Sequence, residues 1–324
     1  METFWFIAIA VLWLGYLFLE GFDFGVGMLL RVLGREESDR RAMLTTIGPV
    51  WDGNEVWLIV AAGATFAAFP GWYAGLFSAG YLPMLLVLLA LIGRGVALEW
   101  RGKVNTARWR ATWDAVIAAG SLVATLGVGL LLSWNVLGVP IDADGNRIGS
   151  PFAALRWDTA LGALAFTGFA LVHGAVFLAL KTDGPLRHRA RRFALVFAPV
   201  GLAPLVMLAV AAQVRSGAEW TWLVVFGGFV AAVFAWLRLN MGREGQAFGL
   251  LGVTLAAAVL ALFGALYPNV LPSTVDPNYS LSIVEAASSP YTLTVMTWVA
   301  AFGAPAVLIY QGWTYWVFRK RVTA

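Results

Sequence analysis

The sequence predicts an all-α polytopic membrane protein that crosses the bilayer about nine times, with its N-terminus outside and its C-terminus in the cytoplasm. Hydrophobic residues make up 60% of the 324 positions and charged residues only 12%, against roughly 25% charged in soluble domains. The mean hydropathy is +0.78. Much of the surface must therefore face lipid, and basic residues clustered in short loops set the orientation.

Each spanning helix needs about 20 mostly apolar residues. The turn signal Phe69-Pro70-Gly71-Trp72 predicts a tight hairpin between the second and third spans. The first run lacks a basic segment and a small-residue cleavage site, so we expect a retained span rather than a signal peptide. We treat residues 1–324 as one membrane-integral domain with spans at roughly 3–30, 47–69, 72–98, 112–135, 157–180, 192–214, 219–238, 247–267 and 291–317.

The orientation follows from the positive-inside rule. With the C-terminal ends of odd-numbered spans inside, 19 of the 22 Lys and Arg residues fall on the cytoplasmic side, and only Arg147, Arg156 and Arg215 fall outside. An extra or missing span would destroy this separation. The cytoplasmic group comprises Arg31, Arg35, Arg40, Arg41, Arg94, Arg101, Lys103, Arg108, Arg110, Lys181, Arg187, Arg189, Arg191, Arg192, Arg238, Arg243, Arg319, Lys320 and Arg321.

Composition also excludes some classes of site and partner. The chain has no cysteine, which excludes disulfides, thiolate metal sites and iron–sulfur clusters from it. The isoelectric point near 9.6 does not indicate nucleic acid, because the basic residues lie in short loops between apolar runs.

Five acids lie within spans or at their ends, where an ionisable group costs about 2.5–3.5 kcal/mol. Glu20 and Asp23 are three residues apart and share one helix face, as do Asp52 and Glu55; Asp114 opens the fourth span. The predicted orientation puts all five in the cytoplasmic part of the membrane. Neighbouring carboxylates in a poorly solvated site cannot all stay ionised, so such a group can exchange protons.

A purely structural interpretation of these acids stays open. Asp23 lies among glycines that allow close helix contacts, so it can cap or bridge packed helices. Asp52 and Glu55 can lie at the interface and pair with loop arginines such as Arg41, and Asp114 can be merely interfacial.

The two histidines and the tryptophans give weaker signals. His188 lies in a basic loop and is expected to be solvated, whereas His173 inside span five is expected to make a helix-to-helix hydrogen bond. No bis-histidine haem site can be built from this chain alone. Trp51 and Trp57 flank the acids of span two and fit a stacked or hydrogen-bonded role beside a polar path.

The segments LEGFDFGVGMLLRVLGR, GPVWDGNEVWL, RWRATWD and LPSTVDPNYSLSIVEAASSPYTLTVMTWVA together resemble subunit II of the cytochrome bd quinol:oxygen oxidases, in the family's order from span one to span nine. The resemblance implies nine helices in two four-helix bundles plus a peripheral helix. It also implies a heterodimer with subunit I, which carries two b-type haems and haem d, and small single-span accessory subunits are possible.

The resemblance further implies a proton path toward haem d along Asp52, Trp57 and Asp114. Asp23 matches the family's GFD aspartate, and Glu20 matches the acid before it. Glu20, Asp23 and Glu55 are expected to tune or extend this path. Val50 and His173 replace a histidine and a glutamine found in some relatives, and a quinone bound in this subunit is possible.

The resemblance places the chain in an oxidase of the bacterial cytoplasmic membrane that oxidises quinol and reduces O2 to water. Two other interpretations remain at this point. A proton-coupled secondary transporter would show a repeat-related pair of sites, which the second half of this chain lacks. A structural partner would use its acids only to fix packing.

Overall fold

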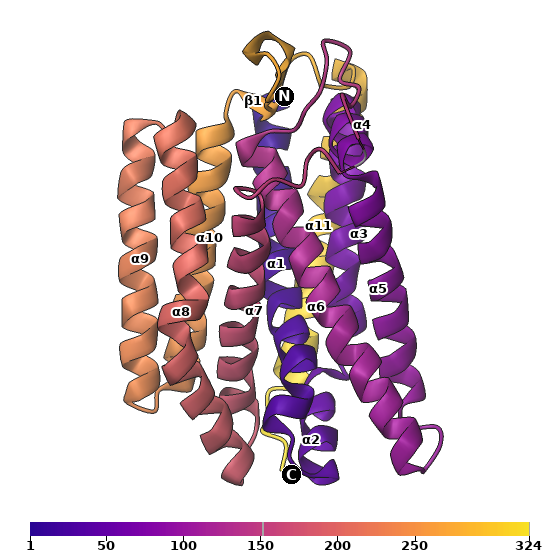
Figure 1. The fold of residues 1–324 in the computed structure, drawn as a ribbon, viewed down its shortest axis with the longest axis vertical. Helices are drawn as coiled ribbons and strands as arrows, with labels where there is room; N and C mark the ends of the chain where they lie inside the picture. Colours follow the sequence, from indigo (N-terminus) through magenta and orange to yellow (C-terminus); the bar gives the residue numbers. More distant parts are fainter. Residues whose placement is uncertain (151, 324) are drawn as a thin grey trace.

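The structure of the chain is a computed structural model that describes residues 1–150 and 152–323. Its long helices lie roughly side by side (Figure 1). The elements are α1 Glu2–Leu33, α2 Glu37–Ile47, α3 Trp51–Ala68, α4 Pro70–Ala79, α5 Tyr81–Trp100, α6 Ala107–Leu137, α7 Ala160–Lys181, α8 Gly184–Ser216, α9 Glu219–Asn240, α10 Glu244–Leu266, β1 Asn269–Leu271, η1 Pro277–Tyr279, β2 Leu281–Ser282 and α11 Pro290–Val317.

Helix α1 occupies the centre and packs against α3, α6 and α7. In Figure 1, α3 and α5 lie to one side of it, α8, α9 and α10 to the other, and α11 passes behind α3. The two termini lie at opposite ends of the long axis. Helix α11 contributes little to the core, since only Leu293 among its residues is buried.

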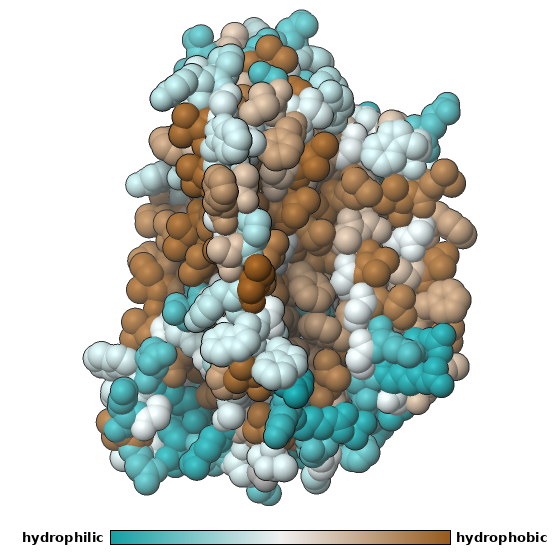
Figure 2. Space-filling view, turned by 180° about the vertical axis from the view of Figure 1, so that it is seen from behind, coloured by the Kyte–Doolittle hydropathy of each residue, from teal (hydrophilic) through white to brown (hydrophobic). Residues whose placement is uncertain are grey.

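Within the described residues, eight helices are long and apolar enough to cross a membrane, and α3 with α4 forms a ninth candidate if that bent pair counts as one span. Figure 2 shows the matching surface, a broad apolar belt between two polar ends. An apolar belt of this extent is typical of a surface that faces lipid or a membrane partner. The chain is thus a multi-pass, all-α membrane protein, as the composition predicts.

The predicted third span is wrong at its start. The chain bends by 119° between α3 and α4 because Pro70 begins α4 without an N–H to donate to the preceding turn. Gly80 then separates α4 from α5, and the Trp134 ring packs so closely there that a Cβ on Gly80 would overlap it. The long helix of this region, α5, therefore begins at Tyr81, and α4 is a separate short helix.

The other predicted boundaries differ by smaller amounts. The fourth span begins at Ala107, where the Thr106 side chain accepts the Trp109 N–H as a cap, rather than near residue 112. The sixth span extends to Gly184–Ser216. Helix α2 lies in a segment predicted as loop, where a capping box formed by Glu36 and Asp39 begins it.

Glycines allow α1 and α7 to touch through their backbones, as the glycine-rich segment of span one predicts. A Cβ on Gly25 would overlap the carbonyl oxygen of Ala170, and one on Gly174 would lie 2.6 Å from the Gly25 Cα. This contact fixes the part of α1 that carries Glu20 and Asp23.

Candidate functional site

The side chain at the centre of the site is Arg94, which lies on α5 and is fully buried. Its Nη1 lies 3.4 Å from a Glu20 carboxylate oxygen and 3.6 Å from one of Glu55, and its guanidinium lies 4.8 Å from the centroid of the Phe24 ring. The prediction of Arg94 as a cytoplasmic loop cation is wrong, since α5 continues to Trp100. A guanidinium so deep inside helices is tolerated because two carboxylates compensate its charge.

Asp23 belongs to a second set of contacts that joins α1, α3 and α11. Asn54 donates to the Asp23 carboxylate at 2.6 Å. The Asn54 carbonyl oxygen accepts from the Tyr315 hydroxyl at 2.7 Å and from Gln311 at 3.0 Å. Gln311 in turn accepts the indole N–H of Trp57 at 2.8 Å. Trp57 is therefore hydrogen bonded beside the acids, as predicted.

Several buried polar atoms at this site have no hydrogen-bond partner among the described residues. They include both carboxylate oxygens of Glu20, one of Asp23, all three guanidinium nitrogens of Arg94 and the Tyr16 hydroxyl. Leaving such atoms unpaired costs about 1–3 kcal/mol each. Sites of this kind are where proteins hold internal water.

Asp52 and Glu55 follow each other on one side of α3. The side chain of Glu55 is 21% exposed and faces Arg94, so it pairs with α5 rather than with Arg41. Asp52 is exposed in the first turn of α3. Asp52 and Glu55 therefore connect the exposed surface of α3 to the buried Arg94 and Glu20.

Asp114 lies in a separate group of charges. Its carboxylate accepts from Arg101 at 2.5 Å and lies 3.3 Å from Arg40, and Arg101 also pairs with Glu37 at 2.9 Å. Arg101 follows Arg94 by seven residues, or about 10.5 Å along the axis of α5. The five acids thus form two groups at two levels rather than one cluster, and Asp114 is a buried ion-pair partner of Arg101 and Arg40.

The pKa of Glu37, which lies outside the spans, gives a pH-dependent prediction. Partial burial raises this pKa, but hydrogen bonds and charge from Arg101, with the charges of Arg110 and Arg40, outweigh it and leave the pKa below its ordinary value of 4.5. The ion pairs of Glu37 therefore contribute stability above pH 4.5 that is lost as the pH falls through the lowered pKa. We expect Glu37→Gln to lower the melting temperature of the purified complex at pH 7. The gap to wild type should narrow as the pH falls below 4.5, and a gap that stays constant from pH 7 to pH 3 would disprove the assignment.

His173 does not make the predicted helix-to-helix hydrogen bond. Its ring is fully buried and packs against Phe18, Phe169 and Phe248, with centroid distances of 4.9, 5.0 and 4.6 Å. Neither ring nitrogen has a hydrogen-bond partner among the described residues. His188 is exposed, as predicted.

Arg94, Asn54, Gln311 and Tyr315 were missed as site residues. The signal for Arg94 was present, because it is a lone cation in the apolar run of span three and is as costly there as the acids. No comparable signal marks Asn54, Gln311 or Tyr315, since neutral polar residues are common in spans and two of their contacts join residues more than 250 positions apart.

The fold and these charges define a class: a multi-pass membrane protein with ionisable groups held between its helices. Comparison with known proteins gives the family. The model of the cytochrome bd terminal oxidase subunit II family matches residues 1–318, and the chain belongs to this family. It is 42% identical to cytochrome bd ubiquinol oxidase subunit 2 of Bacillus subtilis, covering 100% of this chain and 97% of that protein.

Other comparisons agree. The chain is 36% identical to cytochrome bd-I ubiquinol oxidase subunit 2 of Escherichia coli K12, covering 98% of this chain and 94% of that protein. Its fold is similar to a chain in the structure of the bd oxidase from Geobacillus thermodenitrificans, with a TM-score of 0.75, 18% identity, and coverage of 98% and 96%. At that identity, the structural likeness supports the fold alone.

Proposed function

We propose that this chain is the second subunit of a terminal oxidase in the bacterial cytoplasmic membrane, and that its buried ions carry protons toward the redox centres of subunit I. The complex oxidises quinol and reduces O2 to water. Family membership and the names of relatives that are 42% and 36% identical support the role. They favour it over a transporter that acts alone or a purely structural partner.

The haems of such a complex would be held by subunit I. They supply the electron transfer and oxygen chemistry when bound there. The residues of this chain do not fit a haem, because its one buried histidine is enclosed by phenyl rings. In the described residues there is also no group of three or more His, Cys, Asp or Glu side chains that could hold a metal.

The topology we propose has nine spans, with α3 and α4 counted as one crossing, the N-terminus outside and the C-terminus in the cytoplasm. The opposite positions of the termini in Figure 1 and the loop arginines support it. Helix α1 forms one four-helix bundle with α3, α5 and α6, α7 forms the other with α8, α9 and α10, and α11 is the peripheral helix. The acids then lie toward the cytoplasmic ends of their helices.

The proposed path runs from Glu20 through Glu55 to the exposed Asp52, with Arg94 holding Glu20 and Glu55 together. One observation carries this proposal: the 3.4 and 3.6 Å separations that join two carboxylates through one buried guanidinium, surrounded by polar atoms that need water. Water between such groups lets protons pass from one carboxylate to the next. Asp23, Asn54 and Trp57 fix the geometry of α1 and α3 beside it.

Asp114 would supply the entrance from the cytoplasm. The group formed with Arg40, Arg101 and Glu37 lies about 10.5 Å nearer the end of α5 than Arg94 does. Its charges attract and orient water at the polar end of the helices.

Subunit I would cover the exposed side of α3. Asp52 is exposed there, and the residues beyond it, Val56, Ile59 and Val60, are 46–70% exposed. A carboxylate beside an apolar strip is costly against lipid but suits an interface that passes a proton to a partner.

Replacing Asp52 with Asn tests the path at its exposed acid. We expect oxygen consumption by the assembled oxidase to fall about tenfold or more, because a carboxamide cannot relay a proton. The haem spectrum should stay at wild-type intensity. Asp144→Asn is the matched control, since Asp144 is an exposed acid in a loop distant from this site. Wild-type turnover in Asp52→Asn would contradict the proposal.

A further inference from the structure

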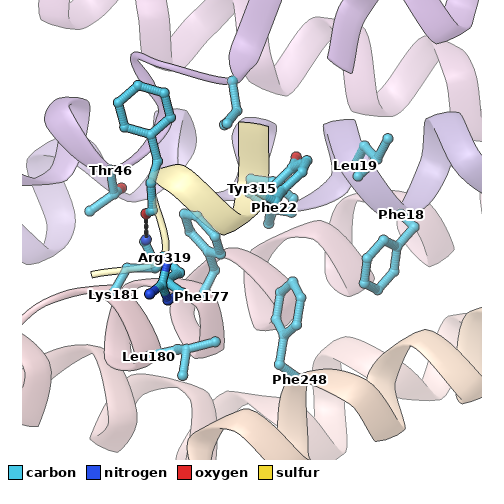
Figure 3. Close-up of a pocket in the computed structure, with 12 residues that line it drawn as sticks. Phe18, Leu19, Phe22, Thr46, Phe177, Leu180, Lys181, Phe248, Tyr315 and Arg319 are labelled. Carbon is cyan, nitrogen blue, oxygen red and sulfur yellow. Dashed lines mark hydrogen bonds between the residues drawn. The ribbon is translucent and has the colours of Figure 1, made fainter. Parts of the chain in front are cut away.

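A second site lies among α1, α2, α7, α10 and α11, and Arg94 and its carboxylates do not line it. It is a partly open cavity of about 320 Å³. Figure 3 shows its wall of aromatic and aliphatic side chains, which includes Phe22 of α1, Phe177 of α7 and Phe248 of α10. Phe22 and Phe177 stack with their centroids 4.1 Å apart. The wall is apolar and preformed, as in small-ligand sites of this size.

Two cations, Lys181 and Arg319, line the same cavity (Figure 3). Lys181 donates to the carbonyl oxygens of Phe318 and Lys320, and the guanidinium of Arg319 lies 4.4 Å from the centroid of the Trp316 ring. These contacts position both charges without neutralising them. In the part of the chain that the structure describes, neither residue forms an ion pair with a carboxylate.

Neighbouring cations differ in this respect. Arg321 pairs with Asp183 at 3.0 Å, and Arg187 pairs with Glu244 at 2.9 Å. Asp183 and Glu244 are thus paired with cations outside the cavity. The positive charges of Lys181 and Arg319 are therefore available to an anionic ligand.

The hydroxyl groups that line the cavity already donate hydrogen bonds within the chain. Thr46 donates to the carbonyl oxygen of Met43 at 2.6 Å, and Tyr315 donates to Asn54 at 2.7 Å. Lys181 donates to two carbonyl oxygens and Arg319 Nη1 donates to the Trp316 carbonyl oxygen at 2.6 Å. The N–H groups left for a ligand are the remaining ones of these two cations, which favours an anionic group over a neutral ring with carbonyl oxygens.

The two cations lie at the ends of helices. The apolar wall of the cavity extends from them along the helix axes, into the part of the molecule expected to lie within the membrane. Helix α7 ends at Lys181 and α11 at Val317. His173, which stacks on Phe248 of the cavity wall, precedes Lys181 by eight residues, or about 12 Å along α7. Cations at headgroup level above an apolar groove fit a molecule with an anionic head and a hydrocarbon tail.

We propose that this cavity binds an anionic phospholipid, with its phosphate between Lys181 and Arg319 and one acyl chain against the phenylalanines. The phosphate would gain two charge-assisted contacts. The acyl chain would cover aromatic surface at the junction of α1, α7, α10 and α11. Arg94, Glu20 and Glu55 do not line the cavity, so a failure of lipid binding would leave the proposed proton path untouched.

The test uses the whole oxidase complex, purified and exchanged into nanodiscs of phosphatidylcholine with increasing phosphatidylglycerol, and native mass spectrometry to count retained lipid. Wild type should retain phosphatidylglycerol in preference to phosphatidylcholine. In Lys181→Gln with Arg319→Gln, the apparent affinity should fall about thirtyfold, or about fivefold for each charge. Lys181→Arg with Arg319→Lys should keep the preference.

Arg31→Gln with Arg35→Gln is the matched control, because these two arginines are exposed and do not line the cavity. This control should bind like wild type. Equal retention of both lipids by wild type, unchanged affinity in the double glutamine variant, or a retained quinone at this site in place of lipid would each overturn the proposal.

Discussion

Replacing Arg94 with Met is expected to destabilise the complex more than any other single change at the site. The guanidinium is fully buried and within 3.6 Å of two carboxylates. Methionine fills similar space but leaves Glu20 and Glu55 without the charge that compensates them. Removing one partner of a buried ion pair costs about 3–5 kcal/mol, which corresponds to a fall of ~10 °C in the melting temperature.

The control for Arg94 keeps the charge balance. In Arg94→Met with Glu20→Gln, one charge of each sign is lost, so the double variant should melt above the single variant. The comparison is made by following thermal unfolding of the purified complex. A single variant that melts and assembles like wild type would show that Arg94 does not hold the acids together.

Replacing Glu20 with Gln is expected to have the largest effect on turnover. Glu20 is the fully buried carboxylate that faces Arg94, and both its oxygens lack a hydrogen-bond partner among the described residues. The amide keeps the shape of the side chain but cannot pick up and release a proton. Because a positioned proton-transfer group contributes about 10²–10⁴-fold, oxygen consumption should fall at least tenfold, with haem content unchanged.

Glu244→Gln is the matched control for Glu20→Gln. Glu244 is also a buried glutamate and pairs with an arginine, Arg187, but at the start of α10 and away from Arg94. Its loss should leave turnover near the wild-type rate. If both variants slowed oxygen consumption equally, the effect would come from loss of an ion pair rather than from proton transfer at Glu20.

The acids of the site could be predicted from the sequence because each carries a large cost in a membrane. Glu20, Asp23 and Glu55 carry this signal, and the structure brings Glu20 and Glu55 together around Arg94, with Asp23 bonded to Asn54 beside them. Arg94 follows the same physical rule, but it was counted with the loop arginines because the positive-inside rule assigns cations near span ends to the cytoplasm. The predicted end of span three lies a few residues beyond Arg94, and it does not determine how deeply the Arg94 side chain is buried.

The remaining site residues depend on tertiary contacts that no local pattern specifies. Asn54 is buried because α11 returns Gln311 and Tyr315 to it from the other end of the chain. His173 does not form the hydrogen bond predicted for it, because phenyl rings from α1 and α10 pack against its ring. The fold class required only composition and periodicity, whereas the start of α5 after Gly80 required knowing how Trp134 packs against that glycine.

The most direct test of the proton path is the uptake of protons by the whole oxidase in lipid vesicles, measured with a pH indicator placed first inside and then outside. In wild type, protons should be taken up from the side at which the C-terminus lies, in step with oxygen consumption. In Glu20→Gln, uptake from that side should slow at least tenfold, together with turnover, while the haem spectrum stays unchanged. Proton uptake at the wild-type rate in Glu20→Gln would contradict a path through the ions around Arg94.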